Sequence, residues 1–124
     1  MMLDLPVDEA YAFDYLSILE VKMQHDSRNR GKFMVFAEVA ASLKRQLRGE
    51  LFQLIKISKE YQELVAANKR TFEAVDRAKK DEVTASFVDE CNYHRYLAKQ
   101  ALQKRFFKGP LKESKIGYER YKKP

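Results

Sequence analysis

Residues 51 to 106 carry apolar positions with the spacing of two helices that pack against each other. From Leu51 to Val75, mostly apolar residues stand alternately three and four positions apart, which is typical of a helix face that contacts another helix. After the polar run 79–82, a similar spacing restarts at Val88 and continues to Phe106. The pattern predicts an all-α protein built on a long antiparallel helical hairpin.

An N-terminal helix is expected to pack on this hairpin and to complete a helical bundle. Pro6 suits the first turn of a helix because its φ is fixed, and the acidic residues near it favour the positive end of the helix dipole. The helix is expected to reach about Met23 and to end before the polar segment 25–31. More than half of its surface is apolar, so we expect it to contact the hairpin on one side and a second subunit on another.

The first arm of the hairpin is expected to be a very long helix. Apolar positions from Phe36 run into Leu51 without loss of phase, so one helix from Lys32 to Lys80 is expected. Such a helix has about 50 residues and a length of about 70 Å, more than a compact chain of 124 residues can cover. Either it bends at Gly49, since an interior glycine costs about 1 kcal/mol relative to alanine, or two copies dimerise along it. We favour the unbroken helix and a homodimer.

The second arm is expected to begin at Thr84, a side chain suited to an N-cap, and to end at Phe107. The Gly109-Pro110 pair that follows disfavours further helix. We therefore expect a helical bundle domain over residues 1–108 and a basic tail over residues 109–124.

The net positive charge of the chain comes from its last residues. Residues 1–103 carry 16 Lys or Arg and 16 Asp or Glu, so the net charge of +6 comes entirely from residues 104–124. That segment interleaves lysines with Tyr118 and Tyr121, a combination that binds phosphate backbones and stacks on bases. Nucleic-acid binding through the tail is therefore one alternative function.

Composition and motifs argue against several other classes. No apolar run approaches the roughly 20 residues of a membrane helix, and the acidic start does not resemble a signal peptide, so we expect a cytoplasmic protein without membrane association. The single cysteine, Cys91, forms no internal disulfide and is expected to be an inert core thiol. Phosphate-binding loops and nucleophile motifs are missing, which predicts no enzyme and no cofactor. Glu90 and His94 lie one turn apart, but a bundle metal site needs more carboxylates and a second histidine, so we expect no metal.

Polar residues interrupt the apolar faces and form one candidate binding site. Two of them lie on one stripe of the first arm, three on one stripe of the second arm, and two on the N-terminal helix. The candidate ligand-binding residues are Asp14, Lys22, Asn68, Asp76, Asn92, Arg95 and Lys99.

Two interpretations of this cluster stay open. In the structural one, Asp14 and Asp76 neutralise Arg95 and Lys99 in a buried network that sets the register of the helices. In the functional one, the two cations hold a small anionic ligand while the two asparagines add directional hydrogen bonds. Balanced charges favour the structural interpretation.

Three short patches resemble a family of short, uncharacterised bacterial helical proteins. Residues 14–22 read DYLSILEVK and resemble the family's opening D-K-[IL]-[ST]-I-L-E-I-K. Asn68, Phe72 and Asp76 resemble the family element N-x-x-L-W-x-x-E-D, and Asn92, Arg95 and Lys99 resemble N-D-x-R-x-x-x-K. The departures from these patterns include Tyr15, Phe72, Val75 and Tyr93. The resemblance implies the helical fold and the grouping of the polar positions, and it implies no activity.

The sequence as a whole predicts a bacterial, non-enzymatic helical module for interaction or scaffolding. A homodimer and a protein partner are the expected associations. A binder of a small anionic ligand at the polar cluster and a nucleic-acid binder through the tail are the alternatives.

Overall fold

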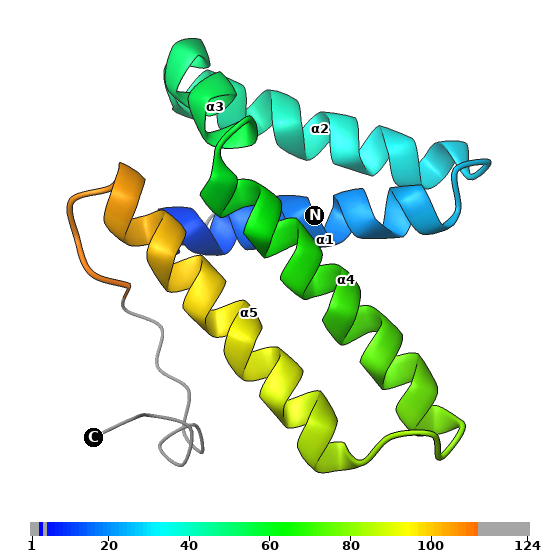
Figure 1. Ribbon diagram of the computed structural model, residues 1–124. Helices are drawn as coiled ribbons and strands as arrows, with labels where there is room; N and C mark the ends of the chain where they lie inside the picture. Colours follow the sequence, from blue (N-terminus) through cyan, green and yellow to red (C-terminus); the bar gives the residue numbers. More distant parts are fainter. Residues whose placement is uncertain (1–2, 4, 112–124) are drawn as a thin grey trace.

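The predicted helical hairpin is present over residues 59–106, whereas residues 51–58, expected in its first arm, lie outside it (Figure 1). A computed structural model describes residue 3 and residues 5–111. Over these residues the chain forms five helices and no strand, which confirms the all-α class. The tail beyond residue 111 lies outside the described residues. The five helices are α1 (Glu9–His25), α2 (Arg30–Gln46), α3 (Gly49–Lys56), α4 (Lys59–Lys79) and α5 (Ala85–Phe106).

Helices α4 and α5 are the two arms of the hairpin, and their capping explains the tight turn between them. At the end of α4, the Asp81 N–H donates to the Ala78 carbonyl and the Glu82 N–H to the Arg77 carbonyl. This is the Schellman arrangement, and it places Asp81 in the left-handed region at φ 58°. Thr84 then caps α5, as predicted, by accepting a hydrogen bond from the Phe87 N–H at 3.1 Å.

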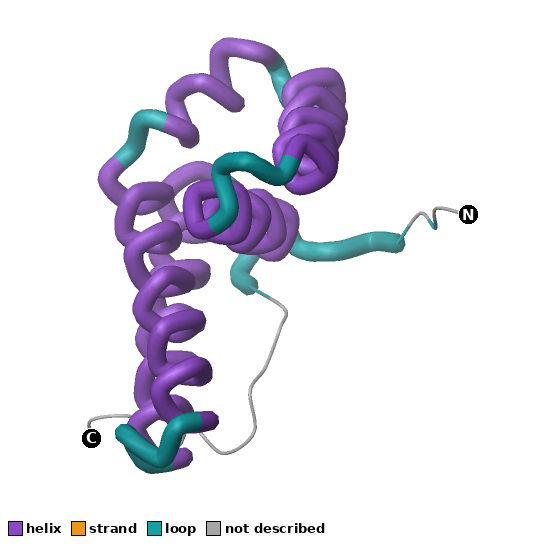
Figure 2. The backbone as a smooth tube through the Cα atoms, turned by 90° about the vertical axis from the view of Figure 1, so that its right-hand side faces the viewer, coloured by secondary structure: helices purple, strands orange, loops and turns teal. Residues whose placement is uncertain are grey.

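Helix α1 crosses the open end of the hairpin, and α2 lies on α1 as an outer layer (Figures 1 and 2). The helix α3 joins this outer layer back to α4. The core sits where α1, α3 and the hairpin meet, and aromatic rings fill its centre: Phe13 contacts both Phe52 and Tyr61. The largest fully buried apolar side chains are Tyr61, Phe13, Leu16, Ile55, Leu64 and Leu102.

The prediction of one unbroken helix from Lys32 to Lys80 is wrong, because the chain leaves the helix twice. Leu47 and Arg48 are extended, with ψ angles of 159° and 137°. Ser58 is extended too, at ψ 154°, and its hydroxyl accepts a hydrogen bond from the Tyr61 N–H at 3.1 Å. Ser58 fits the regular spacing of apolar positions between Leu51 and Val75, but in the structure it is the N-cap of α4.

The glycine expected to mark the bend is not the hinge. Gly49 is the first residue of α3, directly after the break. A Cβ added there meets only the end of the Lys44 side chain, at 3.8 Å, so no close approach requires a glycine. The two breaks fold α2 back onto α1, and the length argument for a homodimer no longer applies.

The residues at and just beyond the end of α5 contact the core as well. Phe106 and Phe107 pack against it, and Leu111, in the first residues of the expected tail, is half-buried there.

None of the described helices combines the length and the apolar content needed to cross a membrane.

Candidate functional site

The centre of the polar cluster is the carboxylate of Asp14, on the side of α1 that faces the hairpin. Its Oδ1 accepts hydrogen bonds from Asn68 Nδ2 at 2.9 Å and Arg95 Nε at 3.3 Å. Its Oδ2 accepts from Arg95 Nη2 at 2.8 Å and lies 3.4 Å from Lys99 Nζ. One carboxylate therefore joins α1 to both arms of the hairpin.

The crossing of α1 over the hairpin brings these residues together. Arg95 and Lys99 stand four residues apart on one face of α5, so both reach the same point on α1. On α4, Asn68 also donates to the hydroxyl of Ser17 at 2.6 Å, one turn beyond Asp14. The remaining member, Asn92, accepts a hydrogen bond from Arg95 Nη1 at 3.3 Å.

The cluster is closed to solvent at its centre. The side chains of Asp14 and Lys99 are 4% and 3% exposed, whereas that of Arg95 is 25% exposed. Burial by itself raises the pKa of Asp14. The hydrogen bond from Arg95 and the positive charge of Lys99 outweigh that effect, so the pKa of Asp14 lies below its ordinary value. Asp14 is therefore a carboxylate at neutral pH.

Two of the seven predicted site residues lie outside this cluster. Lys22 is exposed on α1. Asp76 is also exposed and pairs with Lys80, one turn further along α4, at 3.4 Å. The prediction that Asp76 neutralises Arg95 or Lys99 is wrong, because α1 crosses the hairpin at Asn68, two turns away from Asp76.

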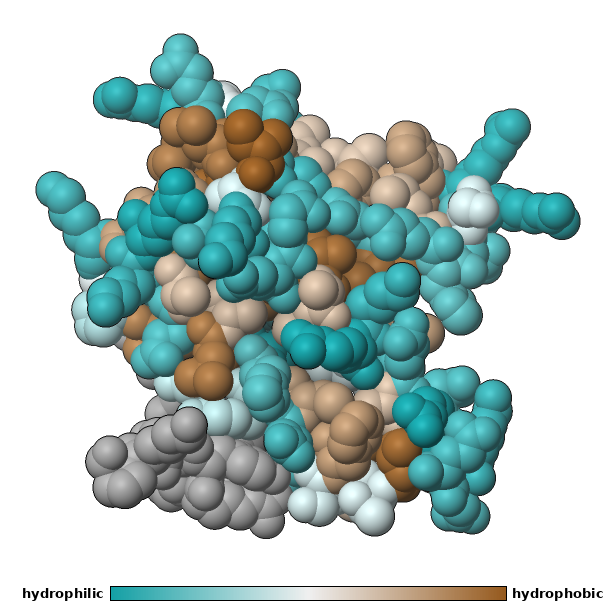
Figure 3. All heavy atoms as spheres, in the orientation of Figure 1, coloured by the Kyte–Doolittle hydropathy of each residue, from teal (hydrophilic) through white to brown (hydrophobic). Residues whose placement is uncertain are grey.

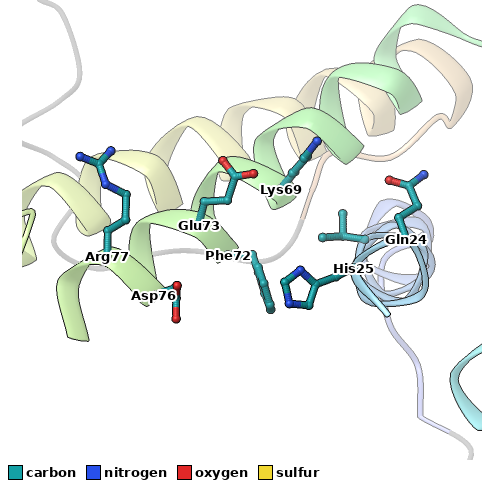
Figure 4. A pocket seen from close by; sticks show the side chains of 8 residues that line it. Gln24, His25, Lys69, Phe72, Glu73, Asp76 and Arg77 are labelled. Carbon is teal, nitrogen blue, oxygen red and sulfur yellow. The ribbon is translucent and has the colours of Figure 1, made fainter. Parts of the chain in front are cut away.

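A shallow groove of about 510 Å³ lies next to the cluster, between the end of α1 and α4 (Figure 4). The rings of His25 and Phe72 meet edge to face there, with centroids 5.0 Å apart. Cations and carboxylates alternate along its α4 wall, as Figure 4 shows for Lys69, Glu73 and Arg77. The wall therefore presents no excess of either charge. In the part of the chain that the structure describes, this groove and three others are lined by residues other than Asp14, Asn68, Asn92, Arg95 and Lys99.

The other residues that could carry chemistry, Glu90, Cys91 and His94, lie on α5. Glu90 and His94 are exposed, with His94 Nε2 3.9 Å from Glu90 Oε1. Within residues 3 and 5–111, no group of three or more His, Cys, Asp or Glu side chains is arranged to hold a metal ion. Cys91 is half-buried on α5, and burial raises the pKa of its thiol, so little thiolate is present at neutral pH.

Two further polar links join α1 to other helices, and neither was predicted from the sequence. Gln103 accepts a hydrogen bond from the Ala10 N–H at 2.9 Å and donates to Glu9 and to the Gly109 carbonyl, so it caps the first turn of α1. Its position could have been found, because it continues the stripe of Arg95 and Lys99 by one more turn.

The second missed link joins α1, α3 and α4. Lys56 contacts Glu20 at 2.7 Å and the hydroxyl of Tyr61 at 3.3 Å, and its ammonium lies 4.4 Å from the centre of the Tyr61 ring. The apolar surroundings and the nearby Glu20 carboxylate raise the pKa of Tyr61, which therefore keeps its proton and donates to Glu20. Helical spacing does not predict this contact, because the break at Ser58 sets the position of Lys56 relative to Tyr61 and Glu20.

The polar atoms of the described interior are satisfied internally. Among these residues, no buried side-chain nitrogen or oxygen lacks a hydrogen-bond partner. The geometry therefore supports the interpretation of the cluster as a network that sets the register of α1 on the hairpin.

Comparison with known proteins adds no functional information. No protein-family model, no curated protein and no solved structure matches the chain. The resemblance of its three short patches to a bacterial helical family stays a prediction.

Proposed function

We propose that this protein is a non-enzymatic helical interaction module and that it binds its partner through α2. The surface in question is one exposed stripe of that helix, here called the α2 outer face. Its residues stand at positions i, i+3, i+4, i+7, i+11, i+14 and i+15, which helical geometry brings to one side. The α2 outer face consists of Arg30, Phe33, Met34, Ala37, Ala41, Lys44 and Arg45.

The exposure of this face supports the proposal. Helix α2 contains no buried residue, although a second stripe including Phe36 and Leu43 packs against the core. On the outer face, Phe33 and Met34 remain 57% and 61% exposed. Figure 3 shows hydrophobic surface along α2, with hydrophilic side chains projecting beyond it. A helix that is apolar on a second side, away from the core, is typical of a protein contact surface.

The alternative of a small anionic ligand at the polar cluster has less support. Asp14 already occupies the position that an anion would take between Arg95 and Lys99. Binding there would require the anion to displace a carboxylate that belongs to the fold. Nucleic-acid binding through the tail rests on residues outside the described part of the chain, as does most of the predicted tail domain.

Site-specific photo-crosslinking tests the proposal in the cells that make the protein. A photoreactive amino acid replaces Ala37 on the α2 outer face and, as a matched control, Ala66, an exposed alanine in the middle of α4. We expect a discrete adduct from position 37 and none from position 66. Adducts of equal yield from both positions, or from neither, would contradict the proposal.

A thermal-shift screen separates this function from ligand binding. Carboxylated and phosphorylated metabolites are tested on the wild type and on the Asn68→Ala variant. We expect no compound to raise the melting temperature of the wild type alone. An anion that stabilises the wild type by several degrees but leaves the variant unchanged would make the polar cluster a binding site and overturn the proposal.

A further inference from the structure

Residues 1–103 are neutral in total, but their basic and acidic side chains are unevenly distributed along the chain. Residues 28–48, which contain α2, carry six Lys or Arg and one Asp or Glu. The other residues up to 103 carry ten basic and fifteen acidic side chains. With Lys104, Arg105 and Lys108 included, the described chain outside residues 28–48 is close to neutral. Helix α2 therefore carries the excess positive charge of the described chain, and it forms an outer layer of the molecule (Figure 2).

The basic residues of the α2 outer face lie at its two ends. Arg30 stands at the first end, and Lys44 and Arg45 stand at the other, about 22 Å away along the helix axis. The one acid of the helix, Glu38, lies at the edge of the face. Within residues 3 and 5–111, no ion pair engages Arg30, Lys44 or Arg45.

The centre of the face is apolar and partly flat. Phe33 and Met34 project as two large side chains near the first end. Ala37 and Ala41, one turn apart, carry only methyl groups and let another helix approach closely. An apolar centre with charged residues at its rim is the usual anatomy of a protein–protein interface.

We infer that the α2 outer face binds an amphipathic helix of another protein, with apolar residues in its centre and acidic residues at both ends. This inference rests on the proposed function and names the class of partner. A helix of about 15 residues matches the length of the face. Its acidic ends would pair with Arg30 and with Lys44 and Arg45, while its apolar centre covers Phe33 and the two alanines.

Charge argues against a second copy of this chain as the occupant. In an antiparallel pair of α2 helices, Arg30 of each copy lies beside Lys44 and Arg45 of the other. In a parallel pair, each of these cations lies beside the same residue of the other copy. Both arrangements place like charges together. A nucleic acid is a poor fit as well, because the centre of the face offers no hydrogen-bond donor and no cation.

Two synthetic peptides test the inference by fluorescence anisotropy. Both are 18 residues long, share one central sequence of leucine and alanine on a single helical face, and differ only in their ends. One carries three glutamates at each end and the other three lysines. We expect the glutamate peptide to bind the wild type at least about tenfold more tightly than the lysine peptide at 0.1 M salt. The preference should shrink at 1 M salt, where the screening length falls to about 3 Å.

A charge-reversal variant provides the decisive comparison. The triple substitution R30E/K44E/R45E should lose the glutamate peptide and gain the lysine peptide. The matched control K69E/R70E/K104E reverses three exposed cations on α4 and α5 and should keep the wild-type preference. Because all six side chains are exposed, both variants should fold, and circular dichroism verifies that they do.

Each other outcome contradicts the inference. Equal binding of both peptides, or loss of the preference in the control variant, would overturn it. Tighter binding of the wild type to a 20-base-pair duplex or to phosphatidylglycerol vesicles, lost in R30E/K44E/R45E, would assign the face to a nucleic acid or a lipid surface. If position 37 crosslinks to a protein while the glutamate peptide does not bind, the interaction module stands and only the class of partner is wrong.

Discussion

Replacing Asp14 by asparagine tests whether the polar cluster holds the fold together. The substitution keeps the shape of the side chain and leaves Oδ1 free to accept from Asn68. It puts an NH₂ group where Oδ2 now faces Arg95 Nη2 at 2.8 Å and Lys99 Nζ at 3.4 Å. Three nitrogen donors then point at one another, and two cations lose the carboxylate that they share.

The expected cost is large for a single substitution. Removing one partner of a buried ion pair costs about 3–5 kcal/mol. We expect a value near the lower end, about 3 kcal/mol, because Arg95 is 25% exposed and can turn toward water, whereas Lys99 at 3% cannot. For a domain of this size, such a loss lowers the melting temperature by about 12 °C.

Urea unfolding followed by circular dichroism at 222 nm measures this cost at pH 7. With a slope of about 2 kcal/mol/M, the midpoint should fall by about 1.5 M and the slope should stay unchanged. The matched control is Asp76→Asn, which removes a carboxylate from a pair whose side chains are 60% and 63% exposed. That control should stay within about 0.5 kcal/mol of the wild type.

The pH dependence gives an independent check. The pKa of Asp14 is lower in the folded protein than in the unfolded chain, where it is about 4. Its contribution to stability is therefore complete above pH 4 and disappears as the pH falls through the lower, folded-state pKa. The difference between wild type and Asp14→Asn should be constant from pH 5 to pH 8 and shrink below pH 4.

Three results would refute this account of the cluster. One is a cost below 1 kcal/mol for Asp14→Asn. Another is an equal cost for Asp76→Asn. The third is a difference between wild type and Asp14→Asn that persists unchanged to pH 2.

Three other substitutions probe the capping of the helices, with stability measured in the same urea assay. Gly49→Ala should stabilise the protein by about 0.5 kcal/mol, because the first turn of α3 has room for a Cβ and alanine favours the helix; a loss of stability would restore glycine as a required hinge. Asp81→Gly should stabilise by about 1 kcal/mol, since it relieves a non-glycine residue at φ 58°; no gain would show that the aspartate is unstrained there. Gln103→Ala should cost about 2 kcal/mol by leaving the Ala10 N–H without its acceptor, and the exposed Gln100→Ala should cost almost nothing; equal effects would argue against the cap.

The sequence predicts the parts of this fold that depend on local periodicity. The hairpin, the start of α5 at its Thr84 cap and the N-terminal helix all follow from apolar spacing and capping residues. Five of the seven candidate site residues also come together, because the spacing of Asn68 on one arm and of Arg95 and Lys99 on the other puts them on facing stripes.

The predictions for Ser58 and Asp76 are wrong because each residue suits two roles equally well by spacing, and tertiary contacts decide between them. Ser58 fits the spacing of a packing face and also suits an N-cap, and only the packing of α3 against the core selects the second role. Asp76 fits the same stripe as Asn68, but the position at which α1 crosses the hairpin decides which of the two residues it contacts. Crossing positions depend on how whole faces pack, and spacing along one helix carries no information about them.

The break at Arg48 changes what the exposed apolar surface of the first arm means for association. A continuous helix would have needed a second copy to cover it, whereas the folded-back α2 covers α1 and turns a basic-ended face outward. Pairing of two copies through this face would bring like charges together, so any self-association should use another surface. Light scattering of the wild type and of Ala37→Glu should therefore give the same mass at 0.15 M salt, because position 37 lies at the centre of the face. A dimer of the wild type that Ala37→Glu converts to a monomer would show that the apolar centre outweighs the charges, and α2 would then be the homodimer interface.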